Sequence, residues 1–145
     1  MQQNELRAVV LEATERERWN AFVANASHFP LMQTCAWGDF KEASGWQVVR
    51  VGVENAGQLV AGIQVLIRSL PLRLASIAYV PRGPILDWQN KTAATLLFDK
   101  VHAVARQNRA IMLKLEPPMQ RTLKTEEMLN AYGFVASSQS NQPPC

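Results

Sequence analysis

The 145-residue sequence has no long hydrophobic run, only two cysteines and no extended run of like charge. A helix that spans a bilayer needs roughly 20 consecutive apolar residues, so no transmembrane segment is expected. The first residues, MQQNELRAVV, lack the charged-then-apolar layout of a signal peptide. Cys35 and Cys145 lie far apart and belong to no Cys-x-x-Cys or Cys/His cluster, so we expect neither a disulfide framework nor a metal site. These absences favour a cytoplasmic protein without a cofactor.

The sequence also lacks the short motifs of common enzyme sites. It contains no Gly-x-x-x-x-Gly-Lys, no Gly-x-Gly-x-x-Gly, no Gly-x-Ser-x-Gly and no His-Glu-x-x-His. His28 and His102 are isolated from other ligand-type or catalytic residues. No catalytic residue is therefore assigned from motifs.

What the sequence does contain is typical of one globular domain. The hydrophobic share is 48% and the charged share 19%, and 145 residues are enough to enclose a core. We expect one domain over residues 1–140, with 141–145 as a tail or the start of a linker. The net charge of +3 tolerates a polyanionic partner but identifies none.

Hydrophobic periodicity predicts an α/β (α+β) protein with a mixed central sheet flanked by helices. Thr14 and Glu17 have the spacing of a capping box at the start of a helix. Asn55 and Gly57 suit a tight hairpin turn, and Gly133 suits a helix end. Strands are expected at 6–11, 46–53, 58–68, 74–80, 111–115 and 134–138, and further helices at 35–43, 91–108 and 125–132.

The stretch AYVPRGPILDWQ, residues 78–89, ends one of these strands with a stiff turn. Proline lacks an amide donor and glycine permits unusual φ values, so the segment cannot continue a central strand. Arg82 is thereby held at the strand end. Either its guanidinium faces an anion, or it only pairs with Asp87 within the turn.

The order of elements resembles that of the Gcn5-related acetyltransferases, which implies a pyrophosphate-binding loop at the start of the central helix. DWQNKTAATLL stands in that place and lacks the loop motif. More specifically, the chain resembles the first domain of the Fem peptidyltransferases, the FemA, FemB and FemX aminoacyltransferases, over about residues 28–143. Four segments in order carry this resemblance: MQTCAWGDFKEASGW (32–46), AYVPRGPILD (78–87), LKLEPP (113–118) and YGFVASSQSNQP (132–143).

The resemblance implies a two-domain enzyme of acetyltransferase-like fold, of which this chain would be the first domain. Its members transfer an amino acid from aminoacyl-tRNA to the stem peptide of a peptidoglycan precursor, either a UDP-linked muramyl pentapeptide or lipid II. The expected partners are therefore these two substrates and a second domain. Without that domain we expect little or no transferase activity. The expected location is the cytoplasm, with lipid II met at the inner membrane surface.

The resemblance also suggests substrate-binding residues. Lys41 matches the family lysine that contacts the diphosphate of the precursor, whereas without the resemblance it would be an ordinary solvated lysine. Arg82 matches a position that is basic in relatives. Trp37 and Tyr79 are expected to line the cleft or the core. Glu116 is an acid at a strand end without an assigned role.

Three other functions remain open from the sequence. The domain could be a non-catalytic module that binds the precursor or serves as a scaffold. It could be an acyl-CoA-dependent N-acyltransferase that has lost its usual loop, which CoA binding would reveal. It could also bind nucleic acid weakly, which a steep salt dependence would reveal.

Overall fold

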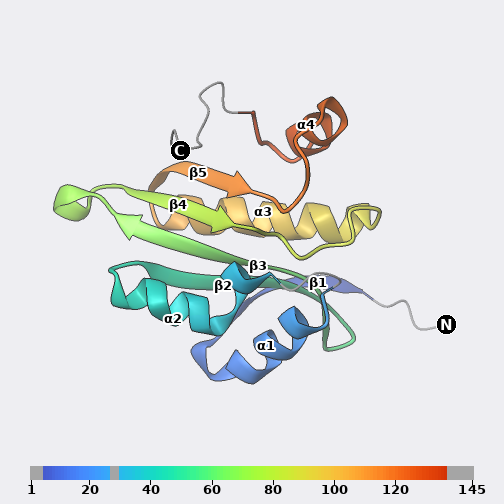
Figure 1. The fold of residues 1–145 in the computed structure, drawn as a ribbon, viewed down its shortest axis with the longest axis horizontal. Helices are drawn as coiled ribbons and strands as arrows, with labels where there is room; N and C mark the ends of the chain where they lie inside the picture. Colours follow the sequence, from blue (N-terminus) through green and yellow to red (C-terminus); the bar gives the residue numbers. More distant parts are fainter. Residues whose placement is uncertain (1–4, 27–29, 137–145) are drawn as a thin grey trace.

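A computed structural model describes residues 5–26 and 30–136, which form one sheet between helices (Figure 1). The helices are α1 Arg16–Ala24, α2 Cys35–Ala43, α3 Lys91–Gln107 and α4 Leu123–Asn130, with short 3-10 turns at Ala13–Glu15, Leu31–Gln33 and Pro71–Arg73. The strands are β1 Leu6–Leu11, β2 Gln47–Asn55, β3 Gln58–Ser69, β4 Ser76–Pro81 and β5 Ala110–Glu116. This is the predicted α/β layout with a mixed sheet. No helix of the described residues is long and apolar enough to cross a membrane.

The sheet has the order β1-β2-β3-β4-β5, antiparallel up to β4 and parallel between β4 and β5. The parallel pair requires a crossover, which α3 supplies. The β2–β3 hairpin turns at Ala56 and Gly57, whose φ angles are 52° and 83°. Both values lie in the left-handed region, which explains the Asn-Ala-Gly sequence of this turn.

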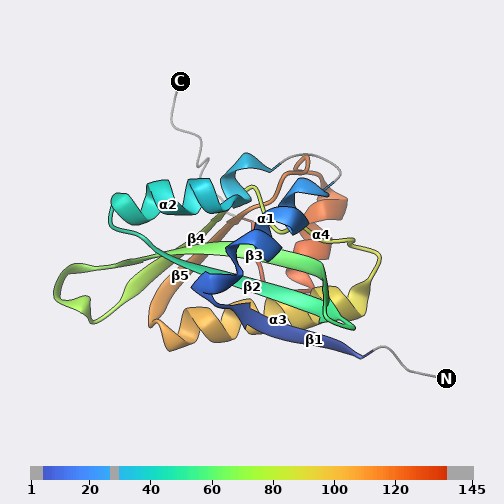
Figure 2. The ribbon, with the colours of Figure 1, turned by 90° about the horizontal axis from the view of Figure 1, so that it is seen from below.

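Helix α3 covers one face of the sheet with a dry apolar core (Figure 2). Alternate residues of the strands point to this face because side chains in a strand alternate with a period of two. The fully buried members of this core include Val51, Val53, Ile63, Val65, Ala78, Val80, Leu97, Phe98 and Val101. The segment that follows α4 packs on α3, where the ring centroids of Phe98 and Tyr132 lie 4.9 Å apart.

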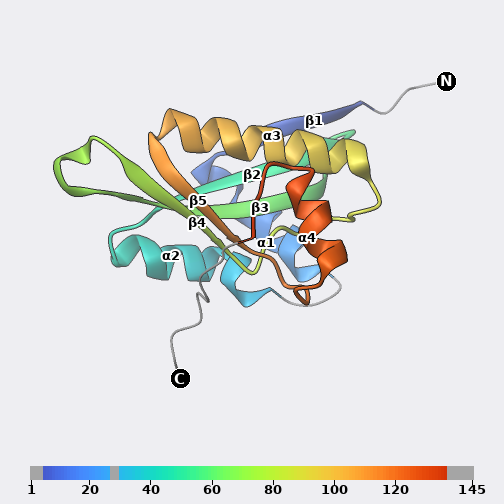
Figure 3. The ribbon, with the colours of Figure 1, turned by 90° about the horizontal axis from the view of Figure 1, so that it is seen from above.

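Helices α1 and α2 cover the opposite face, as Figures 2 and 3 show. The alternate residues of β3 are different here: Gly62 lets the Trp19 ring pack directly on the strand, and Gln64 is a fully buried amide. Gln64 accepts a hydrogen bond from Arg50 Nε at 2.8 Å. Its backbone N–H donates to Gln33 Oε1 at 2.6 Å, and Gln33 Nε2 donates to the carbonyl of Pro81 at 2.8 Å. The buried Gln33 side chain thus ties β3 to the end of β4.

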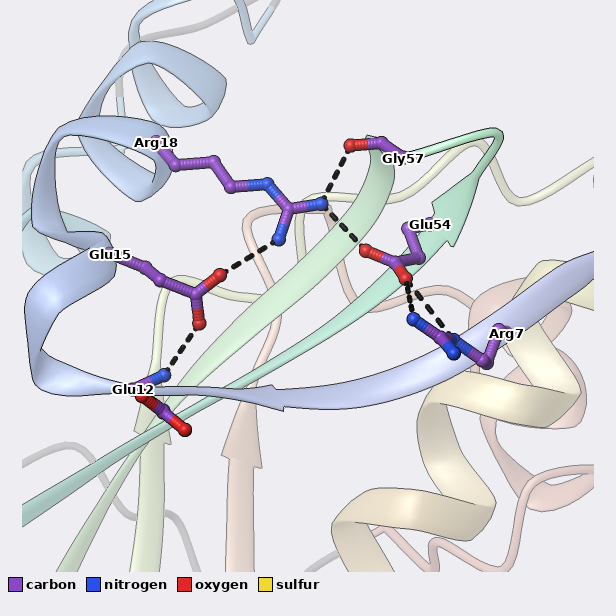
Figure 4. A network of polar contacts seen from close by, with 6 residues as sticks. All are labelled: Arg7, Glu12, Glu15, Arg18, Glu54 and Gly57. Carbon is purple, nitrogen blue, oxygen red and sulfur yellow. Dashed lines mark hydrogen bonds and ion pairs between the residues drawn. The ribbon is translucent and has the colours of Figure 1, made fainter.

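An ion-pair network joins α1 to the edge of the sheet (Figure 4). Glu54 on β2 accepts from Arg18 Nη2 at 2.7 Å and from Arg7 Nε at 3.1 Å. Arg18 also donates to the carbonyl of Gly57 at 2.8 Å. These contacts lower the pKa of the Glu54 carboxyl, chiefly through the hydrogen bonds from Arg18 and then Arg7. The network fixes α1 against the β2–β3 turn.

Two sequence predictions about local structure were wrong. The capping box predicted at Thr14 and Glu17 does not form, because Thr14 lies inside the 3-10 turn Ala13–Glu15. The Glu15 carboxylate instead accepts from the backbone N–H of Glu12 at 2.7 Å, so the turn starts two residues earlier. The strand expected at 134–138 does not form over 134–136, and its remaining residues lie outside the described part of the chain, as does the tail at 141–145. The other strands and helices lie within three residues of their predicted bounds. Gly133 has the expected positive φ, 91°.

Candidate functional site

Helix α2 presents Trp37 and Lys41 one turn apart. Its start is capped by Thr34, whose hydroxyl accepts from the backbone N–H of Trp37 at 3.1 Å. The Lys41 ammonium lies 5.2 Å from the Trp37 ring centroid and 5.7 Å from that of Phe40. None of the ion pairs within the described residues involves Lys41. Its charge is therefore positioned by aromatic rings without being neutralised by a carboxylate.

Trp46 connects this end of α2 to the sheet. Its backbone N–H donates to the carbonyl of Lys41 at 3.0 Å, across a turn in which Gly45 has a φ of 99°. The Trp46 ring lies 6.5 Å from the Tyr79 ring on β4. The Arg68 guanidinium lies 5.7 Å from the Trp46 ring. Trp37, Lys41 and Tyr79, predicted separately, are thus joined through Trp46.

Tyr79 is held by β5 as well. Its hydroxyl donates to the Glu116 carboxylate, and the Lys114 ammonium lies 5.7 Å from its ring centroid. The parallel register places Tyr79 beside Lys114 and Pro81 beside Glu116. Burial and then the Glu116 carboxylate raise the pKa of the Tyr79 hydroxyl, so this group is a neutral donor at physiological pH. Glu116 is therefore a hydrogen-bond partner of Tyr79.

We call the surface formed by Trp37, Lys41, Trp46, Arg68, Tyr79 and Lys114 the cation–aromatic face. It lies on the α2 side of the sheet, because Ala78 and Val80, the neighbours of Tyr79, point to the α3 side. Each of its three cations lies over a ring. Such a surface can bind phosphate through its charges and planar groups through its rings.

Arg82 lies three residues beyond Tyr79, where β4 has ended. Its φ of 56° is uncommon for a non-glycine residue, and its side chain is exposed. The alternative pairing of Arg82 with Asp87 is wrong, because none of the ion pairs within the described residues joins them. Asp87 Oδ1 accepts from the backbone N–H of Gln89 at 3.0 Å, within its own turn. Among the described residues, no ion pair or cation–ring contact joins Arg82 to Lys41 or Trp37. The guanidinium is thus exposed at the strand end.

The start of α3 is closed by its own chain. The Asn90 side chain accepts from the N–H of Ala93 at 3.1 Å, and the N–H of Lys91 donates to the carbonyl of Gln89 at 3.1 Å. A pyrophosphate bound at a helix start needs such amides free. In the residues that replace the acetyltransferase loop, the N–H groups of Lys91 and Ala93 are thus already hydrogen-bonded and not free to bind a pyrophosphate.

A separate groove of about 930 Å³ runs between α1 and the loop that follows β4. Its lining combines apolar side chains, including Phe22, Leu59, Ile85 and Trp88, with polar ones that include Arg18 and Asp87. Within the described part of the chain, no group of three or more His, Cys, Asp or Glu side chains is placed to hold a metal ion.

Sequence reasoning named Trp37, Lys41 and Tyr79 but not the side chains that the structure places around them. Arg68 and Lys114 were not singled out, because only the strand register brings them to Trp46 and Tyr79. Gln64, a lone amide within the apolar run GIQVLI, was the available signal for the buried polar network.

The geometry defines a domain of acetyltransferase-like fold that lacks the usual loop at the start of α3 and carries a cation–aromatic face on the α2 side of the sheet. Solved structures agree: a ribosomal-protein-alanine N-acetyltransferase from Brucella melitensis biovar Abortus 2308 superposes with a TM-score of 0.63 at 16% identity, covering 96% of this chain and 98% of that one. The structure of FemX superposes with a TM-score of 0.74 at 25% identity, over 86% of this chain and 31% of that one.

The chain belongs to the FemAB family, whose model matches residues 14–139. Among curated relatives, the lipid II:glycine glycyltransferase of Staphylococcus aureus strain MRSA252 is 28% identical over 117 residues. That match covers 79% of this chain but only 28% of the relative. The chain therefore spans less than a third of the length of the relatives that it matches.

Proposed function

We propose that this chain is the precursor-binding first domain of an aminoacyltransferase that builds the peptide bridge of peptidoglycan. The donor would be aminoacyl-tRNA, and the acceptor an amine of the stem peptide on a UDP-linked muramyl pentapeptide or on lipid II. The observation that carries the proposal is Lys41, an unneutralised cation on the cation–aromatic face of a FemAB-family domain. A relative, the lipid II:glycine glycyltransferase of Staphylococcus aureus, supports this choice of reaction.

The reaction needs positioning more than it needs a reactive side chain. The acceptor amine attacks the ester carbonyl of aminoacyl-tRNA, an amide bond forms, the ester C–O bond breaks, and a proton moves from the amine to the departing ribose hydroxyl. Holding the two substrates together supplies much of the acceleration in such reactions. In this proposal the described residues bind and orient the acceptor, and a second domain completes the donor site.

The cations have distinct parts in this proposal. Lys41 and Arg68 lie over rings that limit their motion, so they are suited to hold the two phosphates of the precursor. Tyr79, a neutral donor anchored by Glu116, offers an orienting contact nearby. Arg82, exposed beyond the end of β4, is placed to contact an anionic group of the substrate or the second domain.

Calorimetric titration with UDP-linked muramyl pentapeptide tests the assignment. We expect saturable binding that weakens by about tenfold or more in Lys41→Ala, since a direct phosphate contact contributes roughly 1.5–3 kcal/mol. Lys124→Ala, an exposed lysine on α4, is the matched control and should bind as the unchanged chain does. Equal affinity of the two variants would remove Lys41 from the site.

A two-domain form of the protein separates the proposal from a scaffold role. Transfer of an amino acid to the precursor is expected with two domains and little or none with the 145-residue chain alone. Binding without transfer in both forms would favour a non-catalytic binding module. Thermal protection by CoA would instead favour an acyl-CoA-dependent enzyme, which the capped start of α3 argues against.

A further inference from the structure

The β3–β4 hairpin carries an exposed apolar tip. It spans residues 69–75 and projects from one end of the sheet in all three ribbon views (Figures 1, 2 and 3). Leu72 is 86% exposed and Leu74 is 69% exposed. Isolated exposed leucines are common, but two at the tip of one projecting turn form a concentrated apolar point.

The backbone of the tip makes the choice of leucine more unusual. Leu72 and Arg73 have φ angles of 68° and 55°, in the left-handed region where glycine and asparagine are favoured. The turn is nevertheless closed by two hydrogen bonds of 2.9 Å. The N–H of Leu70 donates to the carbonyl of Ala75, and the N–H of Arg73 donates to the carbonyl of Leu70. Leucine is disfavoured at this position in water because its apolar side chain is exposed and because its φ angle is positive. A well-formed turn that nevertheless displays leucine points to a binding role.

The charge around the tip is of one sign. Arg73 lies between the two leucines and Arg68 precedes them, and the sequence contains no Asp or Glu from residue 55 to residue 86. A hollow of about 670 Å³ separates the hairpin from the end of α2, and its lining includes both arginines and no acid. Apolar side chains with flanking cations are the composition that binds an anionic lipid surface.

We propose that the tip of the β3–β4 hairpin inserts Leu72 and Leu74 into the surface of a bilayer that contains anionic phospholipid, with Arg73 at the headgroups. The apolar tip is too small for a stable protein–protein interface, which needs on the order of 800 Å² on each partner. A bilayer requires only that the leucines leave water while the cation remains at the headgroups.

The position of the tip relates this surface to the candidate site. Arg68 lies over Trp46, which also contacts Tyr79, so the base of the hairpin adjoins the cation–aromatic face. A bilayer in contact with the tip would bring a lipid-linked diphosphate to the same end of the molecule. The purpose of the contact rests on the proposed function, whereas the contact itself can be measured without any transfer reaction.

Co-sedimentation of the 145-residue chain with vesicles tests the proposal. The probes are vesicles of phosphatidylglycerol mixed with phosphatidylcholine, compared with phosphatidylcholine alone. Leu72→Asp removes an inserted leucine, and Arg73→Ala removes a headgroup contact. Leu123→Asp is the matched control, because Leu123 on α4 is 74% exposed and lies outside the hairpin. Arg106→Ala on α3 is the corresponding control for charge.

We expect binding to the anionic vesicles that weakens by about tenfold or more in Leu72→Asp and by several-fold in Arg73→Ala and at high salt. Leu123→Asp and Arg106→Ala should bind as the unchanged chain does. Circular dichroism should show all four variants folded, because each changed side chain is exposed.

Absence of binding to anionic vesicles would overturn the proposal, and so would equal binding by Leu72→Asp and Leu123→Asp. Self-association in sedimentation velocity that Leu72→Asp abolishes, without vesicle binding, would instead make the tip a contact between copies of the chain. Titration with the soluble UDP-linked precursor contains no lipid, so failure of either proposal can be recognised separately.

Discussion

The two faces of the sheet are built from the same strands but differ in what they bury. On the α3 face, β3 contributes Ile63 and Val65 to an apolar core. On the α1–α2 face the same strand contributes Gln64, which bonds to Gln33 and Arg50. Strand β4 repeats the contrast, with Ala78 and Val80 on the first face and Tyr79 on the second.

The contrast indicates that one face of the sheet mainly stabilises the fold and the other mainly serves recognition. The α3 face excludes water and contributes most of the hydrophobic stabilisation, which scales with the apolar area removed from water. The α1–α2 face has a smaller apolar cluster around Trp19 and Val23 and adds buried polar groups, whose burial is stabilising only when they are hydrogen-bonded. Substitutions on the first face should therefore change stability, and exposed substitutions on the second should change recognition.

The largest expected effect is on the α3 face. Leu97 is fully buried beneath the sheet, so Leu97→Ala should reduce the free energy of unfolding by about 3 kcal/mol or more through lost burial and a cavity. Urea denaturation measures it. Leu96→Ala is the control, because Leu96 is only partly buried on the same helix and should cost clearly less. Equal losses in the two variants would contradict the assignment of this face as the stabilising core.

A smaller but still large effect is expected beneath α2. Gln33→Leu should destabilise the protein by about 2 kcal/mol or more, because the backbone N–H of Gln64 and the carbonyl of Pro81 would lose partners while buried. The same denaturation experiment with Gln89→Leu, an exposed amide, provides the control. A neutral result for Gln33→Leu would mean that this face tolerates an apolar interior as the α3 face does.

The two faces also differ in how far the sequence could predict them. The apolar period of three and four residues in α3, and the alternation in β2 and β3, follow from the shape of a helix and a strand, and both predictions were confirmed. Lys41 was named from the resemblance to the Fem family and Trp37 as an aromatic of the cleft or the core, so neither followed from the periodicity. The contact from Gln33 to Pro81 joins residues 48 positions apart, and no local pattern encodes it.

The partners on the second face depend on the parallel register of β4 and β5, which forms only after α3 has crossed over. That register brings Glu116 to Tyr79 and Lys114 to its ring. The sequence could name Tyr79 and Glu116 but could not pair them. Asp87 was likewise assigned to Arg82 as a neighbour in sequence, whereas the local turn uses its carboxylate instead.

The smallest expected effect on stability at neutral pH belongs to the hydrogen bond between Tyr79 and Glu116. Tyr79→Phe should cost only about 1 kcal/mol at pH 7, the typical net contribution of one hydrogen bond. Its effect on pH dependence is more specific. The pKa of Tyr79 is raised in the folded chain above the ordinary value of 10.0, by burial and then by Glu116.

The unfolded chain therefore loses the tyrosine proton at a lower pH than the folded chain does, and above about pH 10 deprotonation favours unfolding. The free energy of unfolding of the unchanged chain should therefore fall as the pH rises above about 10. That of Tyr79→Phe should fall less over the same pH range, because the variant has no phenol at this position. Urea titrations from pH 8 to pH 11 measure the difference. Tyr132→Phe is the control, because it retains Tyr79 and its free energy of unfolding should fall with pH as that of the unchanged chain does. Glu116→Gln should fall between the two, because burial, the larger cause, remains. Identical alkaline slopes in Tyr79→Phe and the unchanged chain would show that Tyr79 is not held as a neutral donor on this face.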